Sequence, residues 1–151
     1  MADTTLYNSD DKKIMQTTYR SLNKSRLQEL VNFANNSGFK KLGIATCISM
    51  QKYAALLKDI LEKNGFEVFM INCKESGLKN CEIIADGIAG PSCDPAWQAD
   101  YLNRSGTELN INFGLCLGHG LIFGAKSKAP VTTFVVKDFA SAHNPLAALS
   151  D

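Results

Sequence analysis

The sequence predicts an α/β domain in which helices cover both faces of a mainly parallel sheet of about four strands. Four short runs are rich in apolar and β-branched residues, and segments with helical spacing separate them. The connections are short, and a strand–helix–strand order with short connections favours a right-handed parallel crossover. We therefore expect a three-layer, Rossmann-like arrangement, although no G-x-G-x-x-G nucleotide fingerprint follows the first strand.

Two helices are expected before the first strand. Residues 1–9 are polar and are expected to be frayed, and a first helix begins near Asp10 with apolar residues at helical spacing. Ser25, with Gln28 three residues later, has the pattern of a capping box and starts a second helix that ends at Gly38.

The first parallel crossover follows. Residues 42–46 are predicted to form the first strand, and an amphipathic third helix ends at Asn64 and Gly65. The second strand begins at Phe66. The first and second strands would run in the same direction, because the helix between them returns the chain to the end of the sheet where the first strand began.

The second half of the chain is expected to add two strands. Residues 74–91 contain three glycines and are predicted to form a loop. Asp94 as N-cap and Pro95 at the first helical position start a helix. Three more elements are predicted, namely a strand over 109–115, a helical turn over 119–126 and a strand over 131–136.

The overall composition is that of an ordinary globular domain. The chain has 151 residues, of which 45% are hydrophobic and 21% are charged, so we expect one domain over residues 1–151. The net charge of +1 gives no electrostatic case for nucleic acid or an acidic membrane as partner. We expect a cytoplasmic protein, since the sequence contains neither a secretory signal nor a run long enough to span a bilayer.

Four of the five cysteines lie at boundaries between predicted elements. Cys47, Cys73 and Cys116 each end a predicted strand, and Cys93 directly precedes a helix start. The carboxyl ends of parallel strands share one edge of the sheet, where open α/β sheets bind ligands. We therefore expect these four thiols to converge, with Cys81 outside the set.

The convergent thiols indicate a metal centre as the leading hypothesis. Thiolates are soft ligands that favour zinc, copper(I) and iron–sulfur clusters, and a reducing compartment disfavours a disulfide framework. The spacing lacks the close C-x₂₋₄-C pairs of structural zinc sites, which favours an iron–sulfur cluster over zinc. The expected function is to bind a metal or cluster that takes part in redox reactions or electron transfer. The expected partner is a redox protein or a small molecule.

Two other functions fit the same residues. In one, Cys93 or Cys116 is the nucleophile of an enzyme acting on a small molecule, and His119 is the base. In the other, the thiols are buried core residues of a metal-free interaction domain. His119, His143 and Lys74 could support the thiols or replace one as a ligand, but each also has an ordinary structural interpretation as a cap, a turn or a solvated side chain.

Several short motifs resemble those of a known family. They include Gly114-Leu-Cys-Leu-Gly-His119, Ala129-Pro-Val-Thr-Thr133, Val136-Lys-Asp138 and His143-Asn-Pro145. The chain is similar here to a family of small microbial proteins of unknown function that are labelled as candidate metal-binding proteins. The resemblance implies an α/β domain with a cysteine-based metal site and no established reaction. This sequence departs from the family pattern at Gly120, where an acidic residue is usual, and at Phe139, where a basic residue is usual.

Overall fold

The computed structural model describes residues 1–150 and divides into two compact units. The first unit comprises residues 1–39, and the second begins at residue 40. The expectation of a single domain over residues 1–151 stays a prediction, and its last residue lies outside the described residues.

The first unit is helical. It contains a 3₁₀-helix η1 (Thr4–Leu6) and two α-helices, α1 (Ser9–Ser21) and α2 (Arg26–Ser37). Asn8 and Asp11 form a capping box at the start of α1. The Ser25 side chain accepts a hydrogen bond from the amide of Gln28, as the sequence pattern indicates, and α2 ends at Gly38 in the left-handed conformation.

The second unit is built on a sheet of four parallel strands in the order β2-β1-β3-β4. The strands are β1 (Lys41–Thr46), β2 (Glu67–Asn72), β3 (Leu109–Phe113) and β4 (Val131–Val135). Thr46 pairs with Asn72 on one side and with Phe113 on the other, so β2, β1 and β3 end at the same level. This alignment gives the loops that follow them a common edge.

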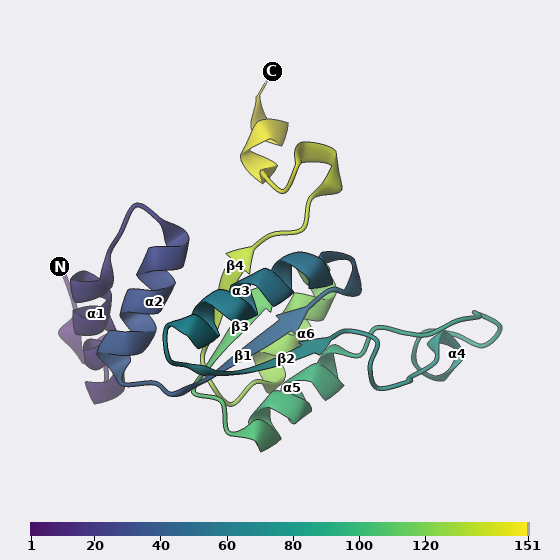
Figure 1. Cartoon of the computed structure of the whole chain (residues 1–151), viewed down its shortest axis with the longest axis horizontal. Helices are drawn as coiled ribbons and strands as arrows, with labels where there is room; N and C mark the ends of the chain where they lie inside the picture. Colours follow the sequence, from purple (N-terminus) through teal and green to yellow (C-terminus); the bar gives the residue numbers. More distant parts are fainter. Residues whose placement is uncertain (151) are drawn as a thin grey trace. The chain divides into compact units, whose positions relative to one another are not determined.

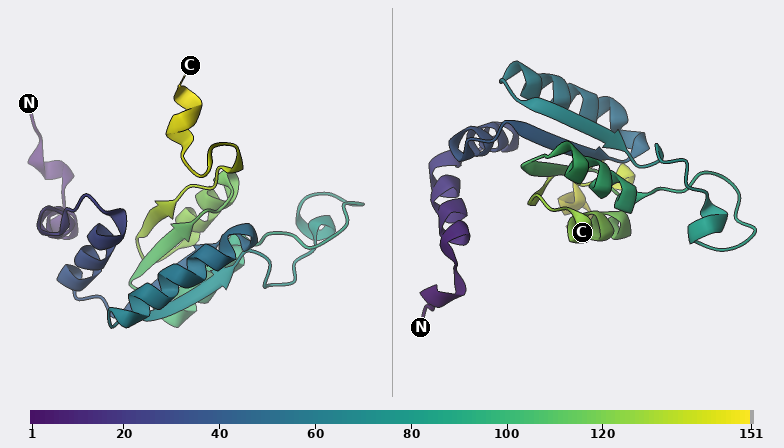
Figure 2. Two further views of the ribbon diagram at one scale, coloured as in Figure 1. Left: turned by 45° about the horizontal axis from the view of Figure 1, so that its top comes forward. Right: turned by 90° about the horizontal axis from the view of Figure 1, so that it is seen from below.

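Helices cover both faces of this sheet and confirm the predicted three-layer α/β class (Figure 1). One face is covered by α3 (Gln51–Lys63), which follows the 3₁₀-helix η2 (Ile48–Met50), and the other by α5 (Pro95–Ser105) and α6 (Leu117–Lys126) (Figure 2). The remaining elements are the short helix α4 (Asn80–Ile83) and the 3₁₀-helices η3 (Phe139–Ser141) and η4 (Pro145–Leu149). Among residues 1–150, no helix is long and apolar enough to cross a membrane.

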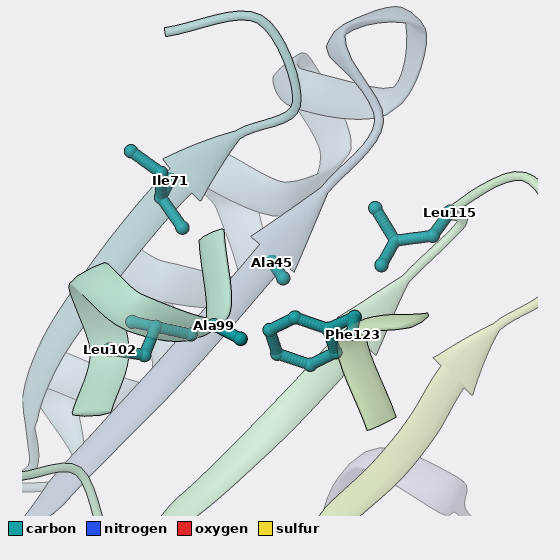
Figure 3. Packing of buried hydrophobic residues seen from close by; sticks show 6 residues of the cluster. All are labelled: Ala45, Ile71, Ala99, Leu102, Leu115 and Phe123. Atoms are coloured by element: carbon teal, nitrogen blue, oxygen red, sulfur yellow. The ribbon is translucent and has the colours of Figure 1, made fainter. Parts of the chain in front are cut away.

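A buried cluster lies between the sheet and the α5–α6 layer (Figure 3). Its members are Ala45, Ile71, Ala99, Leu102, Leu115 and Phe123. Three of them precede a cysteine by one or two positions in the chain, so the loops that carry Cys47, Cys73 and Cys116 are anchored in packed core. Truncating a buried leucine of this kind to alanine typically costs about 2–5 kcal/mol of folding stability.

Candidate functional site

Four cysteines lie at the carboxyl edge of the sheet. Cys47 and Cys73 directly follow β1 and β2, and Cys116 comes shortly after β3. Cys93 lies two residues before α5 and reaches the same edge through its contact with Cys73. Cys81 is exposed on α4, in the segment that extends away from the sheet (Figure 1).

Cys73 and Cys93 form one close pair, here called the dithiol pair. Their sulfur atoms are 3.4 Å apart, with Cys93 donating to Cys73. The amide of Ile48 also donates to Cys73 Sγ, at 3.4 Å. Burial raises the pKa of Cys73 to about 12 and outweighs the Ile48 hydrogen bond, which lowers it. The Cys73 thiol, only 1% exposed, is therefore held in its protonated form.

Cys47 and Cys116 share a cation and are here called the lysine pair. Lys137 Nζ donates to Cys116 Sγ at 2.8 Å and to Cys47 Sγ at 3.3 Å. Burial alone would raise the pKa of Cys47, but hydrogen bonds with Ser49 and the nearby Lys137 ammonium outweigh it and lower that pKa. Burial likewise opposes the charge of Lys137, whose bonds to the two sulfurs prevail and raise its pKa. The shifts in the pKa values of Cys47 and Lys137 both favour a Cys47 thiolate beside the Lys137 ammonium.

Helix starts add positive potential at this edge. Cys47 is the N-cap of η2, which runs into α3, and Cys116 is the N-cap of α6. Neither thiol makes a capping hydrogen bond, whereas Asp94 caps α5 by accepting from the Trp97 amide at 3.0 Å. Three helices thus begin at the thiol edge, and the positive end of a helix dipole favours anionic groups such as thiolates.

Gln98 connects the strands that carry both cysteine pairs. Its Nε2 donates to the carbonyl oxygens of Thr46 and Ile71, each at 3.1 Å, and its side chain is fully buried. These carbonyls lie one and two residues before Cys47 and Cys73, so Gln98 fixes α5 against the ends of β1 and β2. Its Oε1 has no hydrogen-bond partner among residues 1–150, an arrangement that costs free energy in a buried amide.

Gly114 lies between β3 and Cys116. Because it has no side chain, the backbone here can pack closely against Met50 and Lys137. The Gly114 φ of +70° lies in the left-handed region, which glycine adopts without strain. A Cβ at this position would come within 2.9 Å of Met50 Cγ and 3.6 Å of Lys137 Cβ. Only glycine therefore suits the conformation and the close approach of Met50 at this point.

The other candidates from the sequence occupy different surroundings. His119 lies in the first turn of α6 and is half-buried. His143 Nδ1 accepts a hydrogen bond from the Asp138 amide, and its ring packs edge-on against Phe139, so this histidine is engaged within its own loop. Lys74 is half-buried, and its amide donates to the Asn72 side chain.

Sequence reasoning missed three residues of the site. Lys137, Ser49 and Gln98 had no assigned role, although Lys137 follows the end of β4 by two residues. The same rule that selected the cysteines, position after a parallel strand, could have selected this lysine. Gln98 could be recognised only as a polar residue on the buried side of α5.

The described side chains are not arranged as a preformed metal cage. No group of three or more histidine, cysteine, aspartate or glutamate side chains within residues 1–150 is placed to hold a metal ion. The sulfur atoms occur instead as two pairs, one of which is bridged by the Lys137 ammonium. The metal assignment therefore stays a prediction.

Comparison with known proteins places the chain in a family. Residues 3–134 match the model of DUF1847, described as a protein of unknown function. The chain belongs to the DUF1847 family. It is also similar to the uncharacterized protein MJ0455 of Methanocaldococcus jannaschii, at 41% identity over 139 residues, which cover 89% of this chain and 71% of that protein. Membership in a family of unknown function agrees with the resemblance in the sequence, and neither description mentions a metal.

Proposed function

We propose that this protein binds one soft metal ion or iron–sulfur cluster through Cys47, Cys73, Cys93 and Cys116. The observation that carries the proposal is the meeting of two thiol pairs at one sheet edge, with hydrogen-bond donors aimed at their sulfurs. Lys137 donates to both members of the lysine pair, and Ile48 donates to Cys73. Hydrogen bonds of this kind orient thiolate ligands and tune the potential of clusters.

Charge balance supports a cation at this edge. Four thiolates around a divalent ion leave a net charge of about −2, which must be compensated when the site is largely buried. The Lys137 ammonium and the starts of three helices supply that compensation. A bound cation would also replace the proton that Cys73, with its pKa raised by burial, otherwise keeps.

The distribution of the cysteines supports a cluster over structural zinc. Each thiol comes from a different loop, and none belongs to a close C-x₂₋₄-C pair. Such a centre would supply electron transfer when bound. The chain's own residues would provide four ligands, and Lys137 would neutralise part of their charge.

The test is metal analysis with an absorption spectrum of anaerobically purified protein, because clusters are coloured and zinc is not. We expect one centre per chain, and we expect Cys93→Ser and Cys116→Ser to lose it. Cys81→Ser is the matched control and should retain the full content, since Cys81 lies on α4 and is exposed. Equal metal content in all three variants would refute the assignment.

A thiol-dependent enzyme is the second candidate, favoured by the lowered pKa of Cys47 beside Lys137. In this alternative the activating group is Lys137, which contacts both sulfurs of the lysine pair. His119 is the base predicted from the sequence. The rate of thiol alkylation in metal-free protein near neutral pH distinguishes Lys137 from His119 as the activating group. If one thiol is alkylated rapidly, and its rate falls in Lys137→Met but not in His119→Ala, Lys137 is the activating group.

A further inference from the structure

The dithiol pair is positioned for the two cysteines to react with each other. The sulfur atoms of Cys73 and Cys93 are 3.4 Å apart, and the amide of Asp94 donates to the Cys73 carbonyl at 2.7 Å. The two backbones therefore run side by side where the thiols meet. A disulfide needs a sulfur–sulfur distance of about 2.05 Å between neighbouring backbones, so only a small approach is required.

We propose that Cys73 and Cys93 form a redox-active dithiol that exchanges with low-molecular-weight disulfides. This activity goes beyond metal binding and does not depend on it, because it uses the metal-free protein. The two members differ in access, since Cys73 is 1% exposed and Cys93 is half-buried. Cys93 is therefore the thiol that meets a disulfide from solution, and Cys73 is the thiol that resolves the intermediate.

The remaining cysteines are placed less favourably for the same reaction. The sulfur atoms of Cys47 and Cys116 each accept a hydrogen bond from the Lys137 ammonium. Cys81 is exposed on α4, away from the sheet edge. Among the five cysteines, Cys73 and Cys93 are thus the pair that the geometry selects.

The chain between the two cysteines can accept the bond without disturbing the sheet. Residues 74–92 form a long loop, here called the excursion, which begins after Cys73 and ends before Cys93. Hydrogen bonds close this excursion internally, from the Ser92 amide to Leu78 O at 2.7 Å and from the Asn80 amide to Gly90 O at 3.0 Å. A bond across its base therefore reinforces an existing contact between β2 and the start of α5, rather than pulling those elements together.

The reaction balances in two steps. The Cys93 thiolate attacks one sulfur of the small disulfide, forms a mixed disulfide and releases one small thiolate. Cys73 then loses its proton and attacks Cys93 Sγ, which forms the Cys73–Cys93 bond and expels the second small thiol. The protein loses two electrons and two protons, and the small disulfide gains both.

The experiment uses full-length, chelator-treated protein in buffers of oxidised and reduced glutathione, with alkylation of free thiols and peptide mapping by mass spectrometry. Wild type is expected to form one intramolecular bond, joining the peptides of Cys73 and Cys93. Cys73→Ser is expected to accumulate glutathione on Cys93, because the resolving thiol is missing. Cys93→Ser is expected to accumulate none on buried Cys73, and Cys81→Ser should behave as wild type.

Two results would overturn the proposal. One is an oxidised wild type whose bond joins Cys47 to Cys116 or involves Cys81. The other is wild-type protein that stops at a glutathione adduct on Cys93 even when Cys73 is present. Neither outcome bears on metal content, so the failure of this proposal is distinguishable from failure of the metal proposal.

Discussion

The dithiol pair and the lysine pair lie at one sheet edge, yet the pKa values of their buried members are shifted in opposite directions. Cys47 is 7% exposed and Cys73 is 1% exposed, so burial opposes the thiolate in both. Their pKa values nevertheless shift in opposite directions, because Cys47 receives hydrogen bonds from Ser49 and Lys137 while Cys73 has Ile48 and a neighbouring thiol. Local donors, more than depth in the fold, decide which thiol ionises.

The largest expected effect is on the ionisation of the two thiols. Because burial raises the Cys73 pKa from the ordinary 9.0 to about 12, its thiolate fraction near pH 9 should be roughly a thousandfold below that of an ordinary thiol. Cys73→Ala should then remove almost no ultraviolet thiolate absorption at that pH, whereas Cys47→Ala, which removes a thiol whose pKa is lowered from 9.0, should remove more than half an equivalent. Equal losses in the two variants would abolish the distinction between the pairs.

The same shifts predict opposite pH dependences of stability. A raised thiol pKa means that the folded state holds the proton more tightly, so the contribution of Cys73 is present below the unfolded value of 9.0 and is lost as pH rises through about 12. The lowered pKa of Cys47 gives a contribution that is present above its unfolded value and is lost as pH falls through the folded one. Denaturant unfolding of the two alanine variants against pH measures both slopes.

The next largest effect concerns the side chain that connects the pairs. Gln98→Leu removes both hydrogen bonds to the Thr46 and Ile71 carbonyls, which should lower the free energy of unfolding by about 2 kcal/mol. Gln16→Leu, at an exposed glutamine on α1, is the matched control and should change it by less than about 0.5 kcal/mol. Urea unfolding compares them, and similar losses would remove Gln98 from its connecting role.

A smaller effect tests what distinguishes the lysine pair. Lys137→Met removes the ammonium from both sulfurs, and we expect alkylation of Cys47 and Cys116 near neutral pH to slow by roughly tenfold. Lys74→Met is the control, because Lys74 lies next to Cys73 in the chain and its side chain is not part of the lysine pair. Rates from time-resolved mass spectrometry that are unchanged in Lys137→Met would mean that the ammonium does not stabilise these thiolates.

The smallest expected effect concerns the reactivity of Cys93 in the dithiol pair. Asp94→Ala removes the carboxylate that caps α5 at the Trp97 amide and should cost about 1 kcal/mol of stability. It should change the reactivity of Cys93, which directly precedes the cap, and leave that of Cys116 unaltered. Asn8→Ala removes a comparable cap from α1 and serves as control, since it should destabilise without changing the reactivity of any thiol.

The fold and the position of the thiols could be predicted because both depend on local patterns. Asp94 and Pro95 mark the start of α5, and Gly38 marks the end of α2, since caps and breakers are encoded within one turn. Parallel topology then brings Cys47, Cys73 and Cys116 to one edge. These steps need no knowledge of side-chain distances.

The division of the thiols into two pairs could not be predicted in this way. It depends on where Lys137 reaches after β4 and on the path of the excursion between Cys73 and Cys93, which no periodicity encodes. The role of Gln98 is likewise tertiary, because its partners are carbonyls on two strands that are distant in the sequence.

Because Gly114 has no side chain, the loop that carries Cys116 can lie close to the loop that carries Cys47. An added methyl group would come within 2.9 Å of Met50, which follows Cys47 by three residues, and would also touch Lys137. Relief of that overlap would push the loop of Cys116 away from that of Cys47, and one ammonium could no longer span both sulfurs. The hydrogen bonds from Lys137 to both Cys47 and Cys116 therefore depend on glycine at position 114. Gly114→Ala would separate the two thiols from their shared ammonium although neither cysteine is changed.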